Sequence, residues 1–256
     1  MKRFELFASP RSEGSENSDQ STRVEQALSL STHRGGLHYT VFAPLHYEPN
    51  YAYPLLIWLH GPNDDERQLT RIMPQISMRN YVGLGLRGPT RSPNRNGYTW
   101  SADDRDLFAA EMGIFRSYEE LCGKYHIASQ RIFLGGYLSA GTLALRLGMK
   151  YPRRFAGVIS IGGPFPLGHT PLSQLEQVRD LPLCIINGRK SASYGEDRTC
   201  DELRLFHAAG MHVTLRQYPC GDELTPQMLH DVNVWIMEQI TGIDNSPAHD
   251  LSMQPK

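Results

Sequence analysis

A glycine-rich turn between a strand-like run and a helix-like run contains a serine that could do chemistry. Residues 131–149, RIFLGGYLSAGTLALRLGM, read as a buried strand, a sharp turn and a buried helix. A serine on such a turn can attack an acyl ester, because the turn lifts its hydroxyl above the edge of the sheet. Ser139 lies in this turn, and Asp197 and His230 follow it in the order nucleophile, acid, base. These residue types predict hydrolysis of acyl esters as one candidate activity.

Length and composition exclude several other classes of protein. The 256 residues include 26 Lys+Arg, 27 Asp+Glu and 40% hydrophobic residues, which is typical of one α/β domain with its own core. A formal net charge of −1 gives no electrostatic reason to expect a nucleic acid as partner. The four cysteines show neither CxxC pairs nor the spacing of metal ligands. We therefore expect no disulfide framework, no metal and no cofactor.

The two ends of the chain predict flexible tails. Residues 1–35 include the stretch ASPRSEGSENSDQST, which has too few apolar side chains to order itself, and residues 242–256 read the same way. No apolar run of signal-peptide length follows the first residues, and no stretch reads as a transmembrane segment. We therefore expect a cytoplasmic protein whose folded domain spans residues 36–241.

Strand-like and helix-like segments alternate between these tails. Continuous apolar runs are typical of strands in a parallel sheet that is buried on both faces. The alternation within HYTVFA instead suits a more exposed edge strand. The expected strands are residues 37–43, 54–60, 81–86, 131–137, 155–161, 183–187 and 212–218.

Capping signals and apolar spacing predict the helices. Asn63 and Glu66 resemble a capping box at the start of one helix, and Thr225 before a proline would begin the last one. Gly210 would end a helix that starts near residue 197. In the helix expected over 105–125, a set of apolar residues follows 4-3-3-4 spacing and should face the core. This stripe consists of Phe108, Met112, Phe115, Tyr118 and Cys122.

The alternation predicts a single α/β domain with a doubly wound, mostly parallel sheet covered by helices on both faces. Ligands of such sheets bind beyond the carboxyl ends of the strands, so the loops that follow the strands form the candidate site. Gly83, Gly85 and Gly88 there match the G-x-G-x-x-G of dinucleotide sites. The sequence PTRSPNRNG that follows cannot open a helix at once, so we expect no nucleotide.

Five segments, in the same order along the chain, resemble segments of the phospholipase/carboxylesterase family of α/β-hydrolases. They are WLHGPNDDERQL (58–69), the RGP…GYTW stretch (87–100), the strand, turn and helix from residue 131, INGRKSASYG (186–195) and YPCGDELTPQML (218–229). The resemblance covers nearly all of residues 36–241. It implies the α/β-hydrolase fold and a Ser–Asp–His triad that hydrolyses acyl esters or thioesters.

The residues at the three matching positions depart from that triad. The family's G-x-S-x-G-G aligns with the turn so that Leu138 takes the place of the nucleophile. Ser191 stands where the family has its acid, and Asp222 stands where it has its histidine. Leucine has no nucleophilic atom, serine cannot stabilise an imidazolium charge, and an aspartate is a poor base for a serine at neutral pH. The resemblance therefore implies a pseudo-hydrolase.

A shift of the register by one residue would instead make Ser139 the nucleophile. The strand and helix of such a turn pack so closely that the residues two before and two after its vertex must be small. With Leu138 at the vertex these residues are Gly136 and Ala140, whereas with Ser139 there the first of them is Tyr137, which would clash. We therefore expect Leu138 at the vertex.

Two other groups could bind a ligand at the same edge of the sheet. The residues His60-Gly61-Pro62-Asn63 match the family's oxyanion-side loop, whose backbone N–H groups could bind a carbonyl or carboxylate. The structural alternative is that this loop only caps the next helix. Tyr98, Trp100 and Phe165 follow strand ends and could line an apolar groove of acyl size, or pack in the core.

Three functions fit these residues. The first is a catalytically inactive protein with a binding, regulatory or scaffold role, whose partner is another protein or an acyl or carboxylate small molecule. The second is an active carboxylesterase or thioesterase with the displaced residues Ser139, Asp197 and His230. The third is a small-ligand receptor that keeps the pocket without turnover. We prefer the first, because function has to be argued from the site and not from the fold. The sequence does not indicate an oligomeric state.

Overall fold

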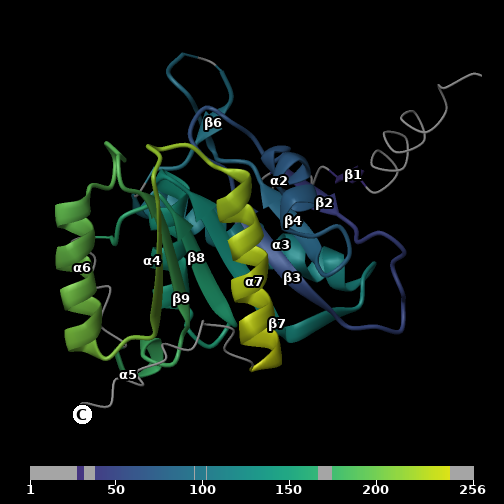
Figure 1. The fold of residues 1–256 in the computed structure, drawn as a ribbon. Coiled ribbons are helices and arrows are strands. Elements are labelled where there is room, and N and C mark those ends of the chain that lie inside the picture. Colours follow the sequence, from purple (N-terminus) through teal and green to yellow (C-terminus); the bar gives the residue numbers. More distant parts are fainter. Residues whose placement is uncertain (1–27, 32–37, 95, 102, 167–174, 243–256) are drawn as a thin grey trace, which may run out of the picture.

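A sheet of eight strands runs through the molecule in the order β1-β2-β4-β3-β7-β8-β9-β10 (Figure 1). The computed structural model describes residues 28–31, 38–94, 96–101, 103–166 and 175–242. Every pairing from β4 to β10 is parallel, while β2 is antiparallel to β4, and β1 to β2. The strands are β1 (Leu28–Ser31), β2 (Tyr39–Phe42), β3 (Tyr53–Leu59), β4 (Val82–Leu86), β7 (Ile127–Tyr137), β8 (Gly157–Ile161), β9 (Leu183–Gly188) and β10 (Val213–Tyr218).

Helices cover both faces of this sheet, as the sequence predicts. All seven residues of β3 are buried, and their side chains alternate between two core clusters, with Leu55 and Ile57 in one and Leu56 and Trp58 in the other. One cluster includes residues of α2 (Gln68–Ile76) and α7 (Pro226–Thr241), which lie on one face (Figure 1). The other includes residues of α3 (Asp104–Cys122), α4 (Ser139–Lys150), α5 (Leu175–Val178) and α6 (Glu196–Ala209). The single α/β domain is therefore confirmed.

The antiparallel edge of the sheet differs from the prediction. The strand expected to be exposed, β2, is fully buried, because β1 pairs outside it from Leu28 opposite Phe42 to Ser31 opposite Tyr39. The strand β1 lies within the segment predicted as an N-terminal tail, and its four residues are too short a run to be recognised by alternation. The rest of the tails 1–35 and 242–256, apart from Gly242, lies outside the described residues, so these boundaries stay predictions.

The face of α3 that contacts the core also differs from the prediction. The buried residues of this helix include Leu107, Ala110, Ile114 and Leu121, whereas Phe108 is 61% exposed. Both sets repeat at helical spacing, and the set that packs inward contains the smaller side chains, which let the helix approach the sheet closely. The apolar stripe Phe108–Cys122 therefore lies on the outer flank of α3.

Other local predictions are confirmed. Thr225 caps α7 by accepting a hydrogen bond from the N–H of Met228, and Gly210 ends α6 in the left-handed conformation with φ +66°. The G-x-G-x-x-G glycines do not open a helix, because Gly83 and Gly85 lie within β4 and the chain after Gly88 continues into a small hairpin of β5 (Thr90–Arg91) and β6 (Tyr98–Thr99). A Cβ at Gly88 would lie 2.5 Å from the carbonyl oxygen of Thr99, so that glycine permits close backbone packing.

No helix in the described part of the chain is long and apolar enough to cross a membrane. The cytoplasmic location stays a prediction.

Candidate functional site

The turn between β7 and α4 has an unusual backbone at Leu138. This residue has φ +54° and ψ −121°, a conformation that costs a non-glycine residue about 1–3 kcal/mol. Its N–H donates to Ile161 O at 2.7 Å, and its carbonyl oxygen accepts from the N–H of Gly141 at 2.8 Å. Ser139 is the first residue of α4, one position beyond this turn. Leu138, and not Ser139, therefore takes the strained position between strand and helix.

Small residues around the turn make its tight geometry possible. A Cβ at Gly136 would collide with the carbonyl oxygen of Ala140, so the residue two before Leu138 touches the residue two after it. A Cβ at Gly163 would lie 2.5 Å from the carbonyl oxygen of Leu138. The Leu138 side chain itself lies over Gly162, whose own Cβ would come within 2.8 Å of the leucine Cδ2. These approaches match the steric requirement used to choose the register.

Ser191 and Asp222 lie together although 31 residues separate them. The parallel pairing of β9 with β10 places Gly188 beside Tyr218, so the loops after both strands leave the sheet side by side. The Ser191 hydroxyl donates to Asp222 Oδ1, and the Ser193 hydroxyl lies 3.2 Å from Asp222 Oδ2. Both carboxylate oxygens of Asp222 therefore have a serine as partner.

Tyr137 joins this pair to the turn. Its hydroxyl donates to the carbonyl oxygen of Asp222, and its ring packs so closely on Gly61 that a Cβ there would not fit. Burial and the nearby Asp222 and Glu223 carboxylates raise the pKa of the Tyr137 hydroxyl. The sequence analysis used Tyr137 only to exclude the register with Ser139 at the vertex. It could not predict these contacts, because the partners of Tyr137 lie in distant parts of the chain.

The displaced triad is not assembled in the structure. Asp197, in the first turn of α6, and His230, in the second turn of α7, are both exposed. The Ser139 hydroxyl oxygen is buried and has no hydrogen-bond partner among the described residues. The described hydrogen bonds therefore do not join Ser139, Asp197 and His230 into a relay.

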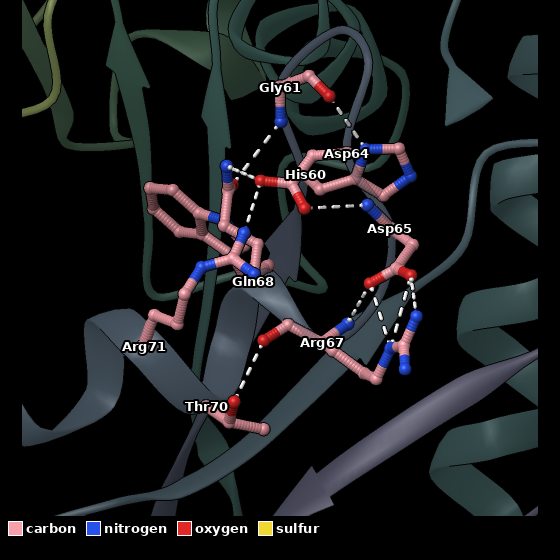
Figure 2. Close-up of polar contacts among 9 residues, drawn as sticks. His60, Gly61, Asp64, Asp65, Arg67, Gln68, Thr70 and Arg71 are labelled. Carbon is pink, nitrogen blue, oxygen red and sulfur yellow. Dashed lines mark hydrogen bonds and ion pairs between the residues drawn. The ribbon is translucent and has the colours of Figure 1, made fainter. Parts of the chain in front are cut away.

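The side chain of His60 binds backbone groups of two loops through both ring nitrogens. The ring is fully buried, with Nδ1 2.7 Å from Gly61 O and Nε2 2.8 Å from the N–H of Gly88 (Figure 2 shows the Gly61 contact). Nε2 accepts from an amide, so Nδ1 has the proton and the ring is neutral. Burial lowers the His60 pKa and outweighs the Gly61 hydrogen bond and three nearby carboxylates that raise it. Both ring nitrogens therefore hold loops, and the binding role of the His60–Asn63 loop stays a prediction.

A buried glutamine supports the same loop and was missed by the sequence analysis. Gln68 Oε1 accepts from Trp58 Nε1 at 2.7 Å and from the N–H of Gly61 at 3.2 Å. Its Nε2 donates to Asp64 Oδ2 at 2.8 Å, and Arg71 binds the same carboxylate oxygen (Figure 2). The Gly61 amide is thus occupied. Pro62 has no amide hydrogen, so neither residue 61 nor 62 offers a free backbone donor.

The predicted capping box at Asn63 is wrong. Asn63 has φ +63°, and α2 begins only at Gln68, without a side-chain cap at Arg67. Glu66 points to a different partner, since its two oxygens bind Arg87 Nε and Nη2, each at 2.5 Å. The buried carboxylate forms this two-pronged ion pair in preference to a helix cap, because a buried charge requires a counter-charge.

The aromatic residues predicted to line a groove are mostly packed inside. Trp100 is 2% exposed, with its ring centroid 5.8 Å from that of His60, and Phe165 packs edge-on against Phe206. Tyr98 is half-buried, and the Arg87 guanidinium lies 4.8 Å from its ring centroid. The core-packing alternative therefore holds for Trp100 and Phe165.

The described residues offer no metal site and no disulfide. They contain no group of three His, Cys, Asp or Glu side chains that could hold a metal ion, and all four cysteines are free. Burial raises the pKa of Cys184 to about 12, and burial together with Glu223 and Asp222 raises that of Cys220. Neither environment favours a thiolate.

Known structures share this arrangement of strands and helices. A carboxylesterase from Mesorhizobium loti superposes with a TM-score of 0.66 and 19% identity, over 82% of this chain and 99% of that one. SOBER1 from Arabidopsis thaliana gives 0.62 and 18%, over 74% and 100%, and acyl-protein thioesterase 2 from Zea mays gives 0.62 and 14%, over 79% and 99%. The chain therefore has the α/β-hydrolase fold.

Sequence comparison adds a shorter similarity. The protein named "Putative esterase NocK" from Nocardia uniformis subsp. tsuyamanensis is 25% identical over 139 residues, or 53% of this chain. The chain spans only 39% of the length of that relative. No family model matches the sequence.

Proposed function

We propose that this α/β-hydrolase-fold protein is catalytically silent as a serine hydrolase and acts by binding, in a regulatory or scaffold role. The observation on which this depends is Leu138 in the positive-φ position between β7 and α4. In an α/β-hydrolase this position presents the nucleophile at the top of the sheet. A leucine there retains the strain of the turn and supplies no nucleophilic atom.

The contacts of Ser191 and Asp222 support the same conclusion. These residues take the positions of the acid and the histidine in the resemblance, and they are hydrogen-bonded to each other as an acid and a histidine would be. A neutral hydroxyl gives little stabilisation to a positive charge, and the carboxylate of Asp222 already has two serine partners. The acid and base positions are thus joined by a hydrogen bond between groups that do not relay a proton.

The loop after β3 supports the proposal from the side of the oxyanion. An oxyanion hole needs amide hydrogens that point into the site and have no other acceptor. The Gly61 amide donates to Gln68, and Pro62 has no amide hydrogen. Loss of one donor of this kind costs enzymes about 100- to 1000-fold in kcat.

The test is the intact mass of the protein after treatment with a reactive fluorophosphonate. We expect no adduct on the wild type and none on Ser139→Ala. An adduct on the wild type that disappears in Ser139→Ala would overturn the proposal and favour the alternative, an active carboxylesterase or thioesterase using Ser139, Asp197 and His230.

A triple variant tests the assignment of positions independently. Leu138→Ser, Ser191→Asp and Asp222→His together restore the residue types that the family has at these positions. We expect this variant to take up one fluorophosphonate, and Ser191→Asp with Asp222→His alone to take up none. Labelling that does not depend on Leu138→Ser would show that the turn is assigned wrongly.

A further inference from the structure

A cavity of about 450 Å³ opens at the end of β3 that is opposite to the candidate functional site. Its lining includes Tyr53 and Pro54, which begin β3, whereas the loop with His60 follows the last residue of that strand, Leu59. Six steps along a parallel strand span about 20 Å, so the length of the strand separates the two places. The volume is within the range of clefts that bind small molecules. The cavity is therefore a second candidate binding site.

Segments that are distant in sequence form the walls of this cavity, and hydrogen bonds hold them together. The loop after β2 is joined to the turn after α2, because the N–H of Leu45 donates to Met78 O at 2.7 Å. The same turn contacts α7, where Asn80 Nδ2 lies 3.5 Å from Asn233 Oδ1. These bonds fix the shape of the cavity, so a ligand does not have to order its walls.

Part of the lining is apolar and includes an exposed aromatic ring. Tyr51 is 48% exposed and stands edge-on to the Tyr53 ring, with 4.7 Å between the ring centroids. Met237 and Ile240, from the last turns of α7, line the same cavity. Tyrosine rings and methionine sulfur atoms both make favourable contacts with aromatic groups. The aromatic group of a ligand would therefore bury this apolar surface and cover a ring that water otherwise contacts.

The lining also contains one fixed charge of each sign. Glu48 and Arg79 are exposed, and neither side chain forms an ion pair or a hydrogen bond with another described residue. His46, whose backbone has φ +58°, adds an exposed imidazole that can bind polar groups of a ligand. A ligand that covers the cavity removes water from both charges, and a charge that loses water without gaining a counter-charge is costly. Such a ligand must therefore bring a positive group for Glu48 and a negative group for Arg79.

We propose that this cavity binds a free α-amino acid with an aromatic side chain. Arg79 is suited to the carboxylate, since a guanidinium binds a carboxylate through two N–H groups. Glu48 is suited to the ammonium group, and the Tyr51 ring together with the apolar end of α7 is suited to the aromatic side chain. A simple aromatic acid or amine would leave one of the two charges unpaired. This inference goes beyond the proposed function and is independent of it, because the turn at Leu138 does not line the cavity.

Isothermal titration of the full-length protein with L-phenylalanine tests the proposal. We expect saturable binding with a dissociation constant below about 1 mM. The comparison compounds are 3-phenylpropionate, which lacks the ammonium group, and 2-phenylethylamine, which lacks the carboxylate. Each should bind at least about fivefold more weakly than L-phenylalanine, because each loses one charge-assisted contact. A wild type that does not bind L-phenylalanine, or that binds all three compounds equally, would overturn the proposal.

Paired charge variants locate the site. Arg79→Gln should weaken the binding of L-phenylalanine at least about fivefold and abolish its advantage over 2-phenylethylamine, because the carboxylate loses its partner. Glu48→Gln should likewise abolish its advantage over 3-phenylpropionate. The matched controls are Arg105→Gln and Glu119→Gln, which change exposed charges of α3 on the other face of the sheet. Substitution of these exposed side chains should leave the fold intact. Equal binding by Arg79→Gln and Arg105→Gln would place the ligand elsewhere and overturn the proposal.

Substitutions of Tyr51 test the aromatic contact. Tyr51→Ala should weaken the binding of L-phenylalanine at least about threefold, whereas Tyr51→Phe, which keeps the ring, should stay within about twofold of the wild type. Phe108→Ala is the control, because Phe108 is an exposed aromatic residue of α3 that does not line the cavity. Wild-type affinity in Tyr51→Ala, or an equal loss in Tyr51→Phe, would contradict the aromatic contact.

Discussion

The turn after β7 and the loop after β3 lie beside each other at one edge of the sheet, yet different parts of the chain hold their shapes. Close approach of backbone atoms holds the turn, where Gly136 and Ala140 touch beneath Leu138. Polar side chains hold the loop, where His60 and Gln68 bind the backbone of their neighbours. A shape made by backbone contact persists whatever the vertex side chain is. When polar side chains hold a loop, their hydrogen-bonding groups and the backbone amides that they bind are no longer free to bind a ligand.

The largest expected loss of stability comes from a substitution in the turn. Gly136→Ala places a Cβ against the carbonyl oxygen of Ala140 and should lower the free energy of unfolding by about 3–4 kcal/mol, because backbone cannot move aside easily. Urea denaturation measures this loss. Gly123→Ala is the control, with its nearest Cβ contact at an ordinary 3.4 Å, and should change stability by less than about 1 kcal/mol. Equal effects would mean that backbone contact does not hold the turn.

The corresponding change in the loop removes its polar support. Gln68→Leu keeps the volume approximately but leaves the buried donors Trp58 Nε1 and Gly61 N–H without an acceptor. We expect the free energy of unfolding to fall by about 2–3 kcal/mol. The same substitution at the exposed Gln75 of α2 should cost less than about 0.5 kcal/mol. If Gln68→Leu were as mild as Gln75→Leu, polar contacts would not shape the loop.

A pH titration sharpens the comparison, because the turn contains no histidine. Burial lowers the His60 pKa below 6.5, so the folded state binds its proton less readily than the unfolded state. The resulting stability is complete above pH 6.5 and is lost as the pH falls through the lowered pKa. Between pH 7 and 5 the free energy of unfolding should fall more in the wild type than in His60→Gln. Parallel curves for the two proteins would contradict the buried neutral ring.

The smallest effect concerns strain at the vertex. Leu138 has φ +54°, a backbone conformation that glycine adopts at lower cost than any residue with a Cβ. Leu138→Gly should therefore be more stable than Leu138→Ala by about 1 kcal/mol. At the exposed helical position Arg204 of α6 the order should reverse by a similar amount. Thermal unfolding of the four variants gives the two differences. If the alanine variant were more stable than the glycine variant at both positions, the backbone of Leu138 would not be strained.

Much of the fold could be predicted from local patterns. The seven expected strands lie within a few residues of β2, β3, β4, β7, β8, β9 and β10, because strands buried on both faces need continuous apolar runs. The vertex at Leu138 could also be predicted, since steric exclusion around a tight turn acts between residues that are neighbours in sequence. The strand β1 was missed because four residues contain too little periodicity.

The candidate site was predicted less completely than the fold. The family resemblance identified Ser191 and Asp222 as matching positions, but not that Tyr137 would join them to the turn or that Ser193 would share the carboxylate. It also left His60 as a candidate ligand contact, because its partner Gly88 lies 28 residues away. Hydrogen bonds between loops of different strands leave no periodic signal in the chain.

The amino-acid sequence determined the alternation of strands and helices, the position of the strained turn and the chemical identity of the residue placed there, because these depend on apolar spacing and on contacts between near neighbours. The folded structure determined which of two apolar faces α3 turns inward, since the choice depends on how closely each set of side chains lets the helix approach the sheet. It also determined whether His60 and Gln68 bind a ligand or their own loop, because long-range pairing of strands brings their partners into reach.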